Sequence, residues 1–255
     1  MRRFFLPGEL RETVTLTGAD AHHLGFTLRA RAGDRVVVVD TARQVAAMEV
    51  VAFTADSVTL RLMERLDADT EPPVALTLAM CLPKGDKMEL IVQKAVELGA
   101  AAVQPLMSQN CVVRYDEKKA ADRRAKWQRV ADEAAKQCGR TALTAVAPVR
   151  PLTEWLREAM APGTAGRVFM AYEDETEQPL KDWLRRESTG PVTAVIGPEG
   201  GFAPAEVEQA RALGVATLSL GPRILRAETA ALAVLAVLQY ELGDLGGRRE
   251  REGMT

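Results

Sequence analysis

Residues 191–202 read PVTAVIGPEGGF, a run of β-branched and apolar residues that leads directly into a loop with three glycines, one proline and one carboxylate. Glycines at this density let a backbone approach a ligand closely or adopt positive φ. Pro204 then suits the first turn of a helix. The stretch therefore predicts a strand, a ligand-facing loop and a helix. The plainer alternative is a tight strand-to-helix turn that holds no ligand.

Strand-like segments alternate with helical patterns on both sides of this stretch. One helix begins near Asp86, which forms a capping-box pattern with Glu89, and a very apolar last helix covers about 228–242. The alternation predicts a parallel sheet with helices on both faces, in which ligands bind beyond the carboxyl ends of the strands. The expected strands are 74–82, 101–107, 143–149, 167–172, 191–197 and 215–221.

The first 70 residues have a different pattern of short strands and turns, which predicts a small β-barrel interrupted by one helix at about 19–29. The acidic, proline-containing segment DADTEPPV marks the change and reads as a linker. We therefore expect a β-barrel domain over 1–71, an α/β domain over 72–244 and a disordered tail over 245–255. The expected strands of the barrel are 13–17, 34–40, 44–53 and 57–66.

Composition limits the function classes. The net charge of −2 argues against a protein that coats nucleic acid by bulk electrostatics. His22 and His23 are the only histidines, so nucleophilic schemes that use histidine are excluded from most of the chain, and no metal site is expected. No apolar run approaches the ~18 residues of a membrane span. Three cysteines without Cys-x-x-Cys spacing suit a reducing compartment, so we expect a cytoplasmic protein.

A second glycine loop, LGPRILRAETA at 220–230, follows the next expected strand and carries Arg223, Arg226, Glu228 and Thr229. Neither loop matches a Walker A motif or a Gly-x-Gly-x-x-Gly fingerprint. Because the two loops follow two of the expected parallel strands, they predict one shared site. The alternative is that these charges belong to a solvated turn and an ordinary first helical turn.

The segment 114–140 carries nine Lys or Arg against five Asp or Glu, which makes contact with phosphate plausible in an otherwise near-neutral chain. An equally good interpretation is a solvated amphipathic helix that buries Trp127, Val130 and Ala134. Lys84, beside a glycine at an expected strand end, is another candidate phosphate contact. A solvated first helical turn explains this lysine almost as well.

The motifs KGDKMELIVQKAVELGA, KQCGR, IGPEGGF and LGPRILRAETA occur in this order, and together they closely resemble the ribosomal RNA small subunit methyltransferase E family of the SPOUT class. The resemblance extends over nearly the whole chain. It implies an N-terminal PUA-like β-barrel that binds RNA and a C-terminal SPOUT α/β trefoil-knot domain with a parallel sheet. It also implies S-adenosylmethionine as cofactor, a homodimer, and methylation of N3 of a uridine in 16S ribosomal RNA or the small ribosomal subunit.

The resemblance also suggests roles for individual residues. Arg226 or Arg140 would stabilise charge on the uracil oxygens, and Glu199 or Glu228 would orient these groups or assist removal of the N3 proton. The cofactor would contact Ile196, Gly197, Pro198, Glu199, Gly200, Gly201, Leu220, Gly221, Ile224, Leu225, Arg226, Glu228, Thr229 and Ala230. The expected RNA contacts are Arg2, Arg3, His22, His23, Arg29, Lys84, Arg114, Arg123, Arg124 and Arg140.

Other functions stay open at this point. The chain could be a SPOUT methyltransferase for another RNA nucleotide, including a ribose 2′-hydroxyl, or a non-catalytic RNA-binding protein of ribosome assembly. A nicotinamide oxidoreductase is a distant third, because the dinucleotide fingerprint is missing.

Overall fold

The computed structural model describes residues 2–164, 166–186 and 190–247, which divide into two compact units. The first unit contains Met1–Glu71 and Ala135–Leu143, and the second contains Pro72–Ala134 and Thr144–Thr255. The segment 135–143 therefore belongs to the first unit, whereas the predicted division placed it in the second range. The expected disordered tail lies outside the described residues from residue 248 onward.

The first unit contains a sheet in the order β1-β3-β4-β5-β2, with β1 parallel to β3 and the other pairs antiparallel. The expected strands are confirmed, and β1 was not predicted because RRFF is short and half charged. Instead of one helix over 19–29, a short α1 (Gly18–His22) continues as the π-helix η1 (His23–Thr27). Closure of the sheet into a barrel stays a prediction. The strands are β1 (Arg2–Phe5), β2 (Thr13–Thr17), β3 (Arg35–Val39), β4 (Val45–Phe53) and β5 (Ser57–Leu66).

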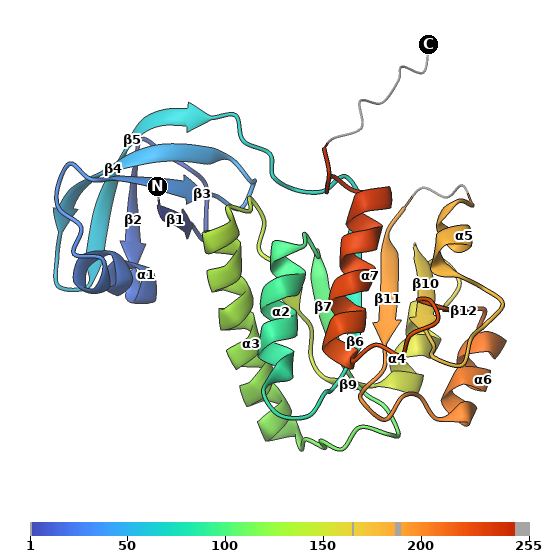
Figure 1. The fold of residues 1–255 in the computed structure, drawn as a ribbon. Coiled ribbons are helices and arrows are strands. Elements are labelled where there is room, and N and C mark those ends of the chain that lie inside the picture. Colours follow the sequence, from blue (N-terminus) through green and yellow to red (C-terminus); the bar gives the residue numbers. More distant parts are fainter. Residues whose placement is uncertain (1, 165, 187–189, 248–255) are drawn as a thin grey trace, which may run out of the picture. The chain divides into compact units, whose positions relative to one another are not determined.

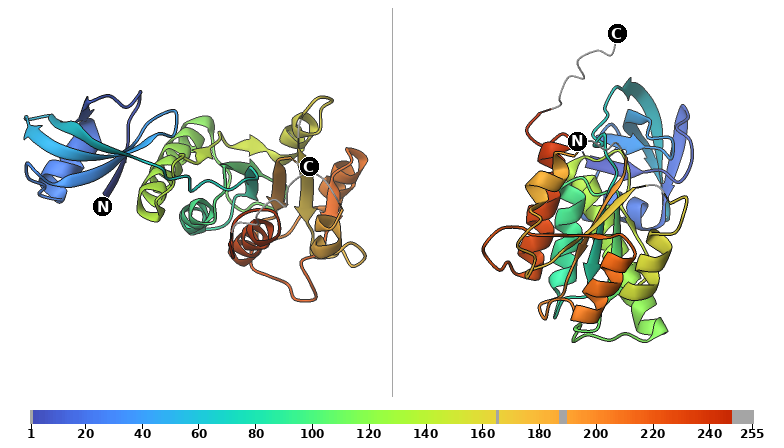
Figure 2. Two further views of the ribbon diagram at one scale, coloured as in Figure 1. Left: turned by 90° about the horizontal axis from the view of Figure 1, so that it is seen from above. Right: turned by 90° about the vertical axis from the view of Figure 1, so that its right-hand side faces the viewer.

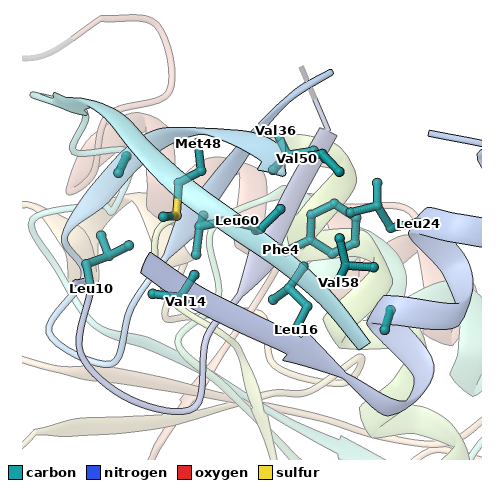
Figure 3. Packing of buried hydrophobic residues seen from close by; sticks show 13 residues of the cluster. Phe4, Leu10, Val14, Leu16, Leu24, Val36, Met48, Val50, Val58 and Leu60 are labelled. Atoms are coloured by element: carbon teal, nitrogen blue, oxygen red, sulfur yellow. The ribbon is translucent and has the colours of Figure 1, made fainter. Parts of the chain in front are cut away.

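Alternation along these strands builds the core of the first unit. In β2, Val14 and Leu16 are buried while the threonines between them are exposed, as expected for a half-buried strand. These side chains pack with Phe4, Leu24 and Leu60 in one apolar cluster (Figure 3).

The second unit contains a sheet of parallel pairs in the order β12-β10-β11-β6-β7-β8, with β9 also paired to β7. The predicted parallel sheet is thus confirmed, although β8 and β12 are shorter than expected. The strands are β6 (Leu76–Cys81), β7 (Ala102–Met107), β8 (Ala145–Val146), β9 (Arg150–Pro151), β10 (Arg167–Ala171), β11 (Val192–Ile196) and β12 (Ala216–Leu218).

Helices cover both faces of this sheet, and α2 and α7 lie side by side on one of them (Figures 1 and 2). α2 buries an apolar face that includes Met88, Ile91, Val92 and Ala95. Most of the apolar side chains of α7 are buried as well. The helices are α2 (Lys87–Glu97), α3 (Glu117–Cys138), α4 (Leu152–Ala159), α5 (Leu180–Leu184), α6 (Pro204–Ala212) and α7 (Ala227–Glu241).

The capping box expected at the start of α2 does not form. The Asp86 side chain makes no capping hydrogen bond. The Glu89 carboxylate instead accepts a hydrogen bond from the Lys126 ammonium on α3. A cation from a neighbouring helix has therefore replaced the local partner that the sequence spacing suggested.

Within the described residues, no helix combines the length and the apolar character that crossing a bilayer requires.

Candidate functional site

A pocket of about 670 Å³ lies at the carboxyl ends of three neighbouring parallel strands, β10, β11 and β12. Its walls come from the segments 171–176, 196–201 and 219–227, together with Ala230 on α7. This is the edge of a parallel sheet at which ligands bind. The volume is in the range of sites for small molecules and cofactors, roughly 300–1,000 Å³.

The first glycine loop, 197–203, follows β11 and is tightly confined. Gly201 has φ +64°, and a Cβ placed there would lie 1.9 Å from Glu173 Oε1. A Cβ at Gly197 would lie 3.1 Å from the Phe202 ring. The side-chain amide of Asn110 donates to the Gly200 carbonyl at 3.0 Å. The loop therefore needs a glycine at least at Gly201, where both the backbone angle and the space exclude a side chain.

The far end of this loop is fixed by the start of α6. Pro204 occupies the first turn, as predicted, and Ala203 is the N-cap residue. The buried Glu206 carboxylate accepts hydrogen bonds from the backbone N–H of Ala203 at 3.0 Å and of Gln109 at 2.8 Å. The loop is thereby held to the turn that follows β7.

Lys87, the first residue of α2, joins the two glycine loops. Its ammonium lies 2.8 Å from Glu199 Oε1 in the first loop and 3.1 Å from Glu228 Oε2 at the start of α7. The backbone N–H of Lys84 also donates to both Glu199 oxygens at 3.2 Å. We call Lys87, Glu199 and Glu228 the Lys87 clamp. The hydrogen bond to Glu199, followed by the one to Glu228, raises the pKa of Lys87.

The clamp keeps both carboxylates ionised. Burial raises the pKa of Glu199, but hydrogen bonds from Lys87 and from backbone N–H groups outweigh it and leave this pKa below its ordinary value. The pKa of Glu228 is also lowered, first by the hydrogen bond from its own backbone N–H and then by Lys87. Lowered pKa values make these groups weak proton acceptors, so the clamp geometry favours a positioning role for both.

Most of the residues that were predicted to bind the cofactor line this pocket. Gly200, Glu228 and Thr229 do not; they lie in the loops and the helix that support it. The lining residues that were predicted are Ile196, Gly197, Pro198, Glu199, Gly201, Leu220, Gly221, Ile224, Leu225, Arg226 and Ala230.

Two parts of the site were not predicted from the sequence: the third wall, residues 171–176 after β10, and Lys87 as a link between the loops. AYEDET contains no glycine or known motif, and its place beside the other two loops depends on β10 lying between β11 and β12. The signal available for Lys87 was that each glycine loop region carries an acidic residue, Glu199 or Glu228. Two carboxylates that lie close together need a cation near both.

Of the predicted catalytic residues, Arg226 and Glu199 line the pocket, and Glu228 is in the clamp. Arg140 belongs to the first unit, where its guanidinium is buried and paired with Glu71. The Glu71 carboxylate also accepts from the backbone N–H of Thr141 at 2.9 Å. Burial raises the pKa of Glu71, but the hydrogen bonds from Arg140 and the backbone leave it below its ordinary value. Arg140 thus secures the segment 135–143 within its unit.

The predicted RNA contacts are divided between the two units. In the first unit, Arg3 donates to the Arg140 carbonyl at 2.7 Å, the His22 ring stacks on Phe26 at 4.8 Å, and Arg29 has φ +51°. Arg2 and His23 are exposed. No group of three or more His, Cys, Asp or Glu side chains that could hold a metal ion occurs in the part of the chain that is described.

The predicted RNA contacts of the second unit lie on and beside α3. Arg114 donates to the Gln109 carbonyl and Arg124 to the Val146 carbonyl, each at 2.8 Å. Arg123 lies 3.8 Å from Asp86, and the Lys84 side chain is exposed. These cations therefore have partners that still leave much of α3 open to solvent, where Lys118, Lys119 and Arg129 are exposed.

Comparison with known proteins places this site in a family. The chain matches the RNA methyltransferase domain family over residues 70–239. It is 33% identical to ribosomal RNA small subunit methyltransferase E of Bacillus subtilis, over 97% of this chain and 99% of that protein. The chain belongs to the ribosomal RNA small subunit methyltransferase E family. A family member from Synechocystis is also 33% identical, over 89% of this chain and 73% of that protein.

Solved structures of methyltransferases have the same fold. Ribosomal RNA small subunit methyltransferase E from Neisseria gonorrhoeae, bound to S-adenosylmethionine, is 32% identical, with a TM-score of 0.85 over 96% of this chain and 99% of that one. A methyltransferase from Legionella pneumophila in complex with the same cofactor is 30% identical, with a TM-score of 0.84 over 95% of this chain and 98% of that one. The α/β fold with a parallel sheet is thus shared with members of the ribosomal RNA small subunit methyltransferase E family.

Proposed function

We propose that this chain uses S-adenosylmethionine to methylate N3 of a uridine in 16S ribosomal RNA of the small subunit. The observation that carries the proposal is the pocket in which both predicted glycine loops meet at the ends of parallel strands. Relatives of the same fold, 32% and 30% identical, bind S-adenosylmethionine. The uridine N3 position is inferred from the family resemblance.

The residues of the pocket fit this cofactor. Ile196, Leu220 and Leu225 supply apolar walls for an adenine ring, and the loop glycines bring main-chain N–H and C=O groups to the surface. The absence of a side chain at Gly201 leaves room for the Glu173 carboxylate at the pocket wall. We propose that the lining residues predicted from the sequence contact the cofactor and that Gly200, Glu228 and Thr229 support them. When bound, S-adenosylmethionine supplies an electrophilic methyl group on its sulfonium.

We assign stabilisation of the uracil oxygens to Arg226 rather than Arg140. Arg226 is exposed and lines the pocket at the start of α7, whereas the Arg140 guanidinium is engaged by Glu71. A guanidinium aimed at developing negative charge stabilises the transition state more than the ground state. Arg226→Ala is expected to keep cofactor affinity within about twofold and to lower kcat by about 100-fold. Equal turnover of variant and wild type would remove Arg226 from the mechanism.

Binding of RNA is assigned to both units. We propose that the first unit is a closed PUA-like barrel and that the second contains the trefoil knot of the SPOUT class, as the resemblance implies. In the second unit, which also contains the pocket, the exposed cations on α3 would contact phosphates of the RNA. Free thiols at Cys81, Cys111 and Cys138 and a ribosomal substrate support a cytoplasmic location.

We also propose a homodimer that forms through α7 and its neighbour α2. Val237 and Tyr240 on α7 and Leu90 on α2 are 41%, 62% and 45% exposed, respectively, which is unusual for large apolar or aromatic side chains on two adjacent helices. Light scattering at micromolar concentration is expected to give twice the mass of one chain. A single-chain mass at that concentration would contradict the dimer.

The function is tested by transfer of a labelled methyl group. The purified protein is incubated with methyl-labelled S-adenosylmethionine and small ribosomal subunits from a strain that lacks this activity, and the label is located by nucleoside mass spectrometry. We expect label in 3-methyluridine. Label in another nucleoside would keep the reaction and change the substrate. No label, together with no cofactor binding by calorimetry, would favour a non-catalytic RNA-binding protein.

A further inference from the structure

Among the described residues, three carboxylates line the pocket: Glu173, Glu175 and Glu199. Two of them are fully engaged by the protein. Glu199 is held in the Lys87 clamp. The buried Glu175 accepts hydrogen bonds from Thr217 Oγ1 at 2.7 Å, Arg211 Nη2 at 3.0 Å and the backbone N–H of Glu177 at 2.9 Å. Both carboxylates are held by hydrogen bonds from protein groups, and the Lys87 clamp as a whole keeps a net charge of −1.

Glu173 differs from both. No hydrogen bond or ion pair joins its carboxylate to any other residue in the described ranges. Its Oε1 lies 1.9 Å from the position that a Cβ on Gly201 would take, so the carboxylate rests against the Gly201 backbone at the wall of the pocket. A glycine at 201 is therefore what leaves room for a negative charge here.

The cations that line the pocket lie on a different wall. Arg223 and Arg226 line it from the loop after β12. On the side of β10, the Arg211 guanidinium is paired with Glu175 and lies over the Tyr172 ring at 6.0 Å, and the Tyr172 hydroxyl donates to Asp174 at 3.0 Å. The pocket thus has an anionic wall at Glu173 and a cationic wall at Arg223 and Arg226.

We propose that Glu173 determines specificity by making the pocket bind the sulfonium form of the cofactor in preference to the demethylated product. This inference rests on the proposed function. S-adenosylmethionine and S-adenosylhomocysteine share the adenosine and amino-acid parts, and they differ by one methyl group and one positive charge on sulfur. The unpaired Glu173 carboxylate is exposed to solvent at the pocket wall. It attracts that charge over several ångströms, with screening by water, and has no such attraction to a neutral thioether. The product would consequently leave more readily than the substrate.

The test compares Glu173→Gln with wild type by titration calorimetry against each cofactor form. We expect the variant to bind S-adenosylmethionine about tenfold more weakly, equivalent to about 1.4 kcal/mol, and S-adenosylhomocysteine within about twofold of wild type. Raising the salt concentration should reduce the wild-type preference, because salt screens a charge–charge attraction. Glu173→Asp retains the charge and is expected to retain most of the preference.

The matched control is Glu177→Gln, which removes the same charge from an exposed position on the same segment that does not line this pocket. It should leave both affinities unchanged. Equal weakening of both forms by Glu173→Gln would assign Glu173 to a shared part of the cofactor and overturn the inference, as would no change at all. Failure of the wild type to bind either form would instead overturn the proposed function, and the inference with it.

Discussion

Gly201→Ala is expected to weaken binding of S-adenosylmethionine by more than about tenfold while the chain still folds. The residue has φ +64°, a conformation that costs a non-glycine residue about 1–3 kcal/mol. The new methyl group would also lie 1.9 Å from Glu173 Oε1, so the Glu173 side chain must move away from the Gly201 backbone. Both effects disturb the same pocket wall. Calorimetry measures the affinity, and thermal unfolding followed by circular dichroism measures the stability.

A substitution at Gly163 separates the cost of positive φ from the displacement of Glu173. Gly163 has φ +87°, but a Cβ placed there meets no atom within 4 Å, and it does not line the pocket. Gly163→Ala should therefore lower the free energy of unfolding by a similar amount and leave cofactor affinity unchanged. Wild-type affinity in Gly201→Ala would show that close approach at this glycine has no part in the site.

Lys87→Met is expected to weaken cofactor binding by about tenfold or more, although Lys87 does not line the pocket. The substitution removes the cation shared by Glu199 and Glu228 and leaves two carboxylates that repel each other, one with a buried oxygen. The two glycine loops then lose their link. Lys87→Arg should restore much of the affinity, because it supplies a cation at the same place.

Coupling between residues distinguishes the clamp from general destabilisation. Glu228→Gln should weaken cofactor binding on its own but add little to Lys87→Met, because both remove one interaction. Lys94→Met, which breaks an exposed pair with Glu97 on the same helix, is the matched control and should have no effect. Fully additive losses for Lys87→Met and Glu228→Gln would contradict the clamp.

The pKa shifts give the pH range over which the clamp stays closed. The pKa values of Glu199 and Glu228 lie below their ordinary value, so their contribution is present above about pH 4.5 and is lost as the pH falls through the lowered pKa values. The raised pKa of Lys87 keeps its contribution up to at least its ordinary value of 10.5. The clamp should therefore not impose a pH dependence on cofactor affinity between these limits.

The sequence allowed prediction of the elements that carry local signals. The alternation after residue 73 predicted the parallel sheet, and the two glycine loops predicted a shared site, since both follow strands whose carboxyl ends meet at one edge. What it could not provide was the order of strands. β10 precedes β11 in the chain but lies between β11 and β12 in the sheet, which is why Glu173 faces Gly201.

Ion pairs between residues far apart in the chain could not be predicted from the sequence either. The resemblance gives Arg140 as one of two candidates to stabilise the uracil oxygens, but its partner Glu71 is 69 residues away and belongs to the same compact unit. Lys87 carries no local signal for a link between the loops, because its partners Glu199 and Glu228 are each more than 100 residues away. Nothing in the local sequence distinguishes a surface lysine from one that joins two distant loops.

A crystal structure of the protein with S-adenosylmethionine tests the central claim most directly, because that claim is the location of the cofactor. We expect density for the cofactor between the loops 197–201 and 219–227, with its sulfonium nearer to Glu173 than to Arg223 or Arg226 and the Lys87 clamp intact. Density for the cofactor outside this pocket, with the two glycine loops free of it, would contradict the account.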